Sequence, residues 1–196
     1  MNIPNLLSGT RIVLAPILLA LAWLDEGRVF LVVLCVSLVT DIVDGKLARW
    51  LGQTSELGAK LDSWGDFATY MSVPFCAAWL RPEFVKAEWM FFAAVVASYT
   101  IPVIIGFVKF RRLTSYHTKA ATLGAYLVGG ASVVIFAGGP AWPFRLATVA
   151  IVLAEIEEIA ITCALPRWRA DVPTLGRALA LRRSTTQAPT TSSAPG

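Results

Sequence analysis

The stretch that decides the fold of this chain is residues 41–66, which read DIVDGKLARWLGQTSELGAKLDSWGD. Its defined positions follow the pattern Asp-x2-Asp-Gly-x2-Ala-Arg-x8-Gly-x3-Asp-x3-Asp. Successive residues of an α-helix turn by about 100°, so the five defined positions within 41–49 share an arc of roughly 140°. The last three positions recur every four residues and share one helix face. Two facing helices would bring four carboxylates, one arginine and two glycines into a single pocket.

Composition places this stretch in an apolar protein. The 196 residues are 56% hydrophobic and 15% charged, with a mean hydropathy of +0.64. Such a composition is typical of a protein with several membrane spans. The net charge of +4 comes without a basic stripe interleaved with aromatic residues, so nucleic acid is not expected as a partner. We expect the positive side chains to meet an anionic lipid surface instead.

The predicted fold is all-α. It is an integral membrane bundle of about six transmembrane helices with an N-terminal interfacial amphipathic segment. The predicted helical segments are residues 1–24, 28–50, 57–80, 89–108, 120–137 and 144–165. Residues 1–183 form one membrane domain. Residues 184–196 are rich in Ser, Thr, Ala and Pro and form a disordered tail.

Lys and Arg are shared unevenly between the two ends of these helices. Thirteen of the seventeen lie on the side that carries both termini and the aspartates, and four lie on the other side. Cytoplasmic ends of membrane proteins collect positive charge. We therefore expect both termini and the aspartates on the cytoplasmic side of the membrane.

The four aspartates need compensation. An ionised carboxylate near hydrocarbon costs on the order of several kcal/mol unless it is paired or binds metal. Hard divalent cations relieve this cost, and oxygen ligands select Mg²⁺, Mn²⁺ or Ca²⁺. Two such ions would make a site for a phosphate ester or a diphosphate. Gly45 and Gly58 leave room for a bulky ligand, and Arg49 can contact phosphate or a nucleobase.

Two other interpretations of the aspartates do not involve this chemistry. In the first, the aspartates pair with Lys46, Arg49 and Lys60 as a packing network, which four carboxylates at helical spacing with two glycines make improbable. In the second, the aspartates form an ion or proton pathway. That reading accounts neither for the glycines nor for the basic residues nearby.

Residues 41–66 resemble a known family: they match the signature of the CDP-alcohol phosphatidyltransferases at all eight defined positions. The opening residues 2–11, NIPNLLSGTR, resemble the start of bacterial phosphatidylglycerophosphate synthases and cardiolipin synthases of that family. The resemblance implies that CDP-diacylglycerol donates a phosphatidyl group to a small alcohol and that CMP leaves. It also implies a homodimer in a bacterial-type inner membrane, with two Mg²⁺ or Mn²⁺ ions as cofactors.

The same resemblance assigns roles by position. Asp41, Asp44 and Asp62 would ligate the metal ions. Asp66 would touch a metal ion and act as the base that takes the proton of the acceptor hydroxyl. The positions that would bind CDP-diacylglycerol are Asn5, Gly45, Arg49, Ser55 and Gly58.

The acceptor is sought in the basic residues after the fourth predicted helix, which are Lys109, Arg111, Arg112 and Lys119. A positive-inside anchor accounts for most of them. The resemblance implies that basic residues in this region hold an acceptor phosphate, and Arg112 and Lys119 are the candidates. Glycerol 3-phosphate is then the leading acceptor, giving phosphatidylglycerophosphate. Phosphatidylglycerol, inositol phosphate and serine are the alternatives.

Two other functional classes use intramembrane carboxylates. An aspartate-rich intramembrane prenyltransferase binds a magnesium diphosphate, but its aspartate clusters have another spacing and it has more spans. A non-enzymatic ion or proton transporter predicts inverted repeats, and the two halves of this sequence show none. The phosphatidyltransferase reading is therefore preferred.

Glu155 and Glu158 share a face of the last predicted helix and cannot face lipid cheaply. Three roles stay open for them: lining the acceptor cavity, bridging a dimer, or pairing with Lys or Arg.

Overall fold

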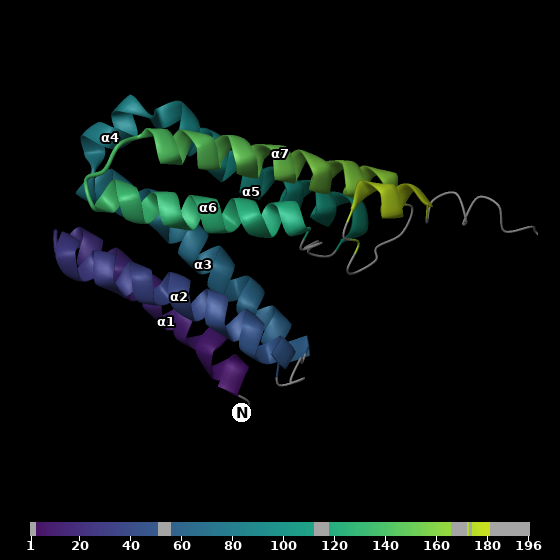
Figure 1. Cartoon of the computed structure of the whole chain (residues 1–196), viewed down its shortest axis with the longest axis horizontal. Helices are drawn as coiled ribbons and strands as arrows, with labels where there is room; N and C mark the ends of the chain where they lie inside the picture. Colours follow the sequence, from purple (N-terminus) through teal and green to yellow (C-terminus); the bar gives the residue numbers. More distant parts are fainter. Residues whose placement is uncertain (1–2, 51–55, 112–117, 166–171, 173, 181–196) are drawn as a thin grey trace, which may run out of the picture. The chain divides into compact units, whose positions relative to one another are not determined.

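The computed structural model describes residues 3–50, 56–111, 118–165, 172 and 174–180, without the side chains of 3–8, 44–50, 56–63, 66 and 119. Every regular element in this part of the chain is a helix (Figure 1). The helices are α1 (Ile3–Trp23), α2 (Gly27–Trp50), α3 (Glu56–Leu80), α4 (Pro82–Ala87), α5 (Trp89–Phe110), α6 (Lys119–Phe136) and α7 (Trp142–Ala164). A short helical segment, 175–180, follows.

The predicted all-α class is confirmed, and the six long helices agree with the predicted segments to within two residues at each end. The sequence did not predict α4, which begins with Pro82 at a position where a missing N–H costs nothing. Among the described residues, only α5 is both long and apolar enough to cross a membrane. The count of six spans therefore stays a prediction. The predicted tail, 184–196, lies outside the described residues.

The chain divides into two compact units. The first comprises Met1–Ala93 and Gly129–Arg145, and the second comprises Ala94–Val128 and Leu146–Gly196. The helices α5, α6 and α7 each contribute to both units.

In the first unit, α1 packs against both α2 and α3 (Figure 1). The turn after α1 is tight: Asp25 has a φ of 58°, and the N–H of Glu26 donates to the carbonyl of Leu21 at 2.9 Å. This pattern closes a helix and reverses the chain. Because α2 runs back along α1 and α3 reverses again, the start of α1, the end of α2 and the start of α3 lie at one end of the unit.

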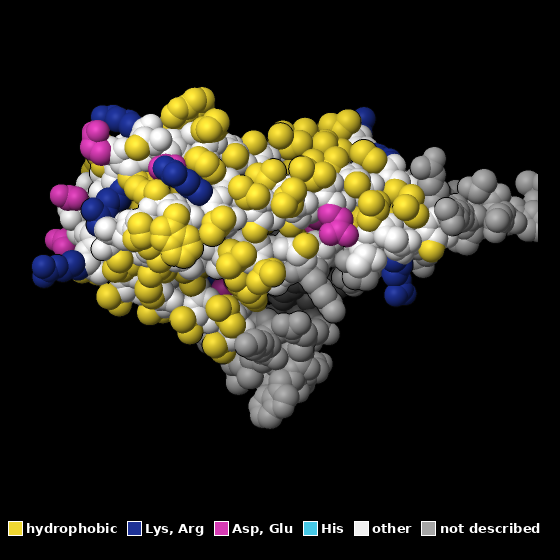
Figure 2. All heavy atoms as spheres, turned by 45° about the horizontal axis from the view of Figure 1, so that its top comes forward, with side chains coloured by type: hydrophobic (Ala, Val, Ile, Leu, Met, Phe, Trp, Pro, Cys, Tyr) yellow, Lys and Arg dark blue, Asp and Glu magenta, His cyan; other side chains and the backbone are white. Residues whose placement is uncertain are grey.

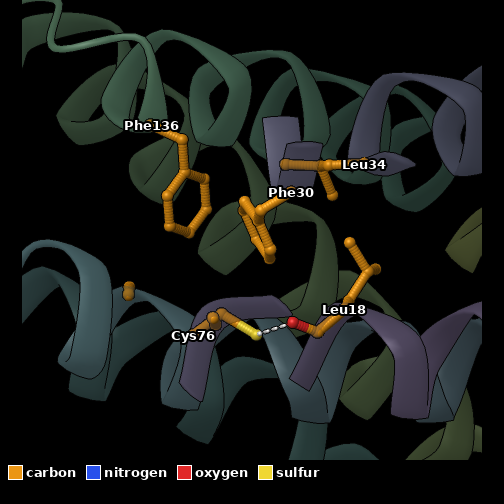
Figure 3. Close-up of a cluster of buried hydrophobic side chains, with 7 residues drawn as sticks. Leu18, Phe30, Leu34, Cys76 and Phe136 are labelled. Atoms are coloured by element: carbon orange, nitrogen blue, oxygen red, sulfur yellow. Dashed lines mark hydrogen bonds between the residues drawn. The ribbon is translucent and has the colours of Figure 1, made fainter. Parts of the chain in front are cut away.

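A hydrophobic cluster holds the other end of the first unit together (Figure 3). Its buried members are Leu18, Ala22, Phe30, Leu34, Cys76, Ala77 and Phe136. The rings of Phe30 and Phe136 meet edge to face, with centroids 4.5 Å apart. The thiol of Cys76 donates to the carbonyl of Leu18 at 3.6 Å. These contacts from α1, α2, α3 and α6 fix the register of the helices that carry the aspartates.

In the second unit, α6 and α7 approach closely at Gly124. A Cβ atom there would lie 2.8 Å from Cδ1 and 3.0 Å from Cα of Ile151. Any larger residue would force the two helices apart. The C-terminal end of α7 is capped by Lys109, whose Nζ donates to the carbonyls of Thr162 at 2.8 Å and Cys163 at 3.0 Å. The ammonium group thus stabilises the negative end of that helix.

Two glutamates of α7 bind backbone N–H groups. The buried Glu158 accepts a hydrogen bond from the N–H of Thr118 at 3.5 Å, just before α6 begins. Glu157 accepts one from the N–H of Leu175 at 3.3 Å and so ties the segment 175–180 to α7. The sequence raised three roles for Glu158, and this backbone contact was not among them.

Candidate active site

All eight defined positions of the signature lie on helices of the first unit. The second half of α2 carries Asp41, Asp44, Gly45, Ala48 and Arg49, and the first half of α3 carries Gly58, Asp62 and Asp66. These two half-helices lie at the same end of the unit, as the chain reversal between them requires (Figure 1). The predicted placement of the signature on two helices is therefore confirmed, and their facing one another across a single pocket stays a prediction.

One aspartate of the signature has a partner that the sequence analysis missed. Nη1 of Arg11, on α1, forms an ion pair with Oδ1 of Asp41, on α2. The Arg11 side chain is 2% exposed and that of Asp41 is 28% exposed. From the sequence alone, Arg11 is only one of the positive charges expected on the cytoplasmic side. The usable signal was its place inside an apolar run, where an arginine requires a buried partner.

Two buried hydroxyls lie one helical turn beyond the aspartates. Ser37 precedes Asp41 by four residues on α2, and Thr69 follows Asp66 by three residues on α3. Their Oγ and Oγ1 atoms have no hydrogen-bond partner among the described residues. Burying a hydroxyl without a partner is costly, so such atoms mark places where water or a ligand oxygen binds. Each of the two helices that carry the signature therefore also holds one buried hydroxyl without a partner among the described residues.

The remaining predicted site residues are placed by their backbone or not at all. Asn5 lies in the first turn of α1, and Lys119 is the first residue of α6. Ser55 and Arg112 lie outside the described residues. The side chains of Asp44, Asp62 and Asp66 also lie outside the described part, and no three potential metal ligands gather among the side chains within it. The roles assigned to these residues stay predictions.

Comparison with known families shows to which family the chain belongs. The sequence model of the family described as CDP-alcohol phosphatidyltransferase matches residues 1–157. The chain belongs to the CDP-alcohol phosphatidyltransferase family. Membership confirms what the signature in residues 41–66 indicated, and the match includes α1, which supplies Arg11.

Individual relatives within the CDP-alcohol phosphatidyltransferases match different lengths of the chain. A putative cardiolipin synthase of Mycobacterium tuberculosis (strain ATCC 25618 / H37Rv) is 30% identical over 145 residues, 72% of this chain and 68% of the relative. The cardiolipin synthase (CMP-forming) of Rattus norvegicus is 48% identical over 66 residues, 33% of this chain and only 22% of the relative. A CDP-diacylglycerol–glycerol-3-phosphate 3-phosphatidyltransferase of Aquifex aeolicus (strain VF5) is 40% identical over 67 residues, 34% of this chain and 37% of the relative. No solved structure matches the chain significantly.

Proposed function

We propose that the chain transfers a phosphatidyl group from CDP-diacylglycerol to a small alcohol and releases CMP. The observation that carries the proposal is the complete signature, divided between α2 and α3 at one end of the first unit. Membership of the CDP-alcohol phosphatidyltransferase family supports it, since the match covers both helices.

In the proposed reaction, the acceptor hydroxyl oxygen attacks the phosphatidyl phosphorus. The bond between that phosphorus and the oxygen bridging to CMP breaks, and CMP leaves with the electron pair. Asp66 takes the proton of the hydroxyl, as a carboxylate placed beside the attacking oxygen can do. Asn5, Gly45, Arg49, Ser55 and Gly58 are proposed to bind the CDP-diacylglycerol.

The oxygen ligands that the signature offers fit hard divalent cations. All four acids of the signature are aspartates, and the Ser37 and Thr69 hydroxyls, which lack a partner among the described residues, add oxygen atoms on the same two helices. We propose that Asp41, Asp44, Asp62 and Asp66 hold two Mg²⁺ or Mn²⁺ ions. When bound, such ions would neutralise the donor's diphosphate and stabilise charge on the leaving group.

Apolar outer faces support a bilayer around these helices. Valines at 29, 32, 36, 39 and 43 form one stripe along α2, each between 47% and 62% exposed. In the second unit, α5 and α7 present similar faces. Their exposed members are Ile101, Ile104, Phe107, Val108, Leu146, Val149, Leu153 and Ile156. Figure 2 shows hydrophobic side chains across much of the visible face. Exposing so much apolar surface to water is unfavourable, whereas contact with lipid tails is not.

Exposed tryptophans support a membrane boundary. Trp23 ends α1, Trp79 lies in the last turn of α3, and Trp89 and Trp142 begin α5 and α7. All four belong to the first unit. Tryptophan is enriched where a membrane meets water. We propose six spans, with these tryptophans at the outer boundary and both termini and the signature on the cytoplasmic side, in a homodimer.

Two candidate acceptors share one chemistry: each contains a glycerol unit with a free hydroxyl group at one end and a phosphate group at the other. Glycerol 3-phosphate is the first candidate, with Arg112 and Lys119 proposed to bind its phosphate. Lys109 is not proposed, because its ammonium group caps α7. Phosphatidylglycerol is the second candidate, favoured by the match to putative cardiolipin synthases, which spans 145 residues and so extends beyond the signature.

The experiment that tests the proposal measures CMP release from CDP-diacylglycerol by the purified full chain with Mg²⁺ or Mn²⁺. Glycerol 3-phosphate, phosphatidylglycerol, inositol phosphate and serine are supplied one at a time. We expect release with one glycerol acceptor and none after the metal is chelated. Mass analysis of the lipid product identifies the acceptor. Absence of CMP with every acceptor would contradict the proposal, and diphosphate release from a prenyl donor would favour the prenyltransferase class.

A further inference from the structure

An ion pair joins Arg11, which follows Thr10 in α1, to Asp41, the first aspartate of the signature. At 2% exposure the guanidinium is almost completely removed from solvent. A buried arginine is stable only where an anion compensates it, and removing one partner of such a pair is strongly destabilising. The ion pair with Asp41 supplies such an anion, and it ties α1 to α2 at the level of the signature.

The two partners differ in what else they can contact. Asp41 keeps 28% of its side chain exposed while Arg11 keeps 2%. The exposed part of Asp41 is the part that the buried guanidinium does not cover. An arginine can thus hold this carboxylate from the protein side and leave its outer side accessible. That arrangement is how partners outside the ligand set orient metal-binding carboxylates in proteins.

We propose that Arg11 is a positioning residue for the metal site. Its guanidinium fixes the Asp41 carboxylate in one orientation on the signature face of α2. Its charge also offsets the negative charge of Asp41 before any cation arrives. This inference rests on the proposed function of Asp41 as a metal ligand.

A purely architectural role for Arg11 makes a different prediction. If the ion pair only ties α1 to α2, its loss lowers the melting temperature, and the protein that stays folded binds metal normally. If Arg11 positions Asp41, its loss weakens metal binding by the folded protein. Removing the partner of a metal-binding side chain typically costs about 10–100-fold in affinity.

The test titrates Mn²⁺ alone into the purified full chain and follows the free ion by electron paramagnetic resonance, without donor or acceptor. Arg11→Met removes the charge and keeps the length of the side chain. We expect it to raise the Kd for Mn²⁺ by about 10–100-fold. Arg11→Lys keeps the charge but loses the planar fork, and we expect a smaller rise. Arg145→Met, which breaks another ion pair of the same unit, is the matched control and should leave the Kd unchanged.

Wild-type Kd values in both Arg11 variants would overturn the inference and leave Arg11 as a tie between helices. If Arg11→Met does not fold, Arg11→Lys decides alone, and an unchanged Kd overturns the inference. Asp44→Asn separates this outcome from failure of the proposed function. If Asp44→Asn weakens Mn²⁺ binding and the Arg11 variants do not, only the role of Arg11 is wrong. If the wild-type chain binds no Mn²⁺, the metal site and the inference are both wrong.

Discussion

Two ion pairs in the first unit are mirror images in their burial. In Arg11–Asp41 the arginine is 2% exposed and the carboxylate is 28% exposed. In Arg145–Glu88 the carboxylate is 6% exposed and the arginine is 54% exposed. In both pairs one member is buried and needs the other as compensation. The pairs differ in which charge remains accessible, and only the first leaves an acid of the signature facing outward.

The second pair has the features of a structural lock. Nε and Nη2 of Arg145 donate to the two carboxylate oxygens of Glu88 at 2.9 and 2.5 Å. Glu88 lies between α4 and α5, and Arg145 lies in the first turn of α7. The bidentate pair therefore joins the α4–α5 corner to the start of α7. Ion pairing alone therefore does not mark a functional site. What distinguishes the first pair is that its more exposed member, Asp41, belongs to the signature.

The largest effect is expected within the signature itself, at the proposed base Asp66, which belongs to neither ion pair. Asp66→Asn should lower the rate of CMP release by about 10²–10⁴-fold, because the amide cannot accept the hydroxyl proton. Binding of CDP-diacylglycerol should be largely retained. Glu88→Gln, in the Arg145–Glu88 pair outside the signature, should keep a rate close to that of the wild type. Near-wild-type turnover by Asp66→Asn would show that the base is another residue.

A smaller effect is expected at Thr69, one helical turn after Asp66 on α3. Thr69→Val removes a buried hydroxyl that has no partner among the described residues, so the melting temperature should not fall. If that hydroxyl binds water or a ligand oxygen, CMP release should drop by about tenfold, the equivalent of one hydrogen bond. Thr162→Val is the control, since the Thr162 hydroxyl donates to the carbonyl of Glu158 at 2.9 Å. A lower melting temperature with unchanged activity in Thr69→Val would contradict this expectation.

Breaking the second pair should affect stability and not chemistry. Arg145→Met leaves the buried Glu88 without its bidentate partner, and the melting temperature should fall by on the order of 5 °C. The folded variant should release CMP at close to the wild-type rate. A large loss of activity at unchanged stability would remove the distinction between the two pairs.

The smallest effect is a pH dependence of stability. Hydrogen bonds from Arg145 hold the pKa of Glu88 below its ordinary value, although burial of the carboxyl group opposes them. A lowered pKa in the folded state stabilises the protein above the ordinary glutamate pKa, and this stabilisation is lost as the pH falls through the lowered value. Between about pH 6 and pH 3, the melting temperature should therefore fall more steeply in the wild type than in Glu88→Gln. Parallel curves would show that Glu88 does not contribute.

Local patterns made much of this fold predictable. Long apolar runs separated by polar breaks located the six long helices, and the spacing of the aspartates placed the signature on two of them. The signature is readable because its chemistry depends on positions within single helices. The family followed from the same residues.

Contacts between distant segments were not predictable in the same way. Arg11 and Lys109 were both counted as charges of a cytoplasmic surface, yet one pairs with Asp41 and the other caps α7. Glu158 binds the backbone N–H of Thr118, forty residues away. Charge counting along a sequence predicts the side of the membrane, but it does not show which group a charged side chain will meet once the helices pack.

The Arg11–Asp41 pair also bears on the order in which the chain is assembled. Arg11 lies in the middle third of α1, and only three residues separate α1 from α2. In the proposed topology α1 spans the membrane, and an arginine at the centre of a membrane helix costs about 2.5–3.5 kcal/mol on insertion. The aspartate that compensates it is synthesised thirty residues later. We therefore expect the first helix to be retained in the bilayer only when the second accompanies it, so that the two enter during translation as a hairpin.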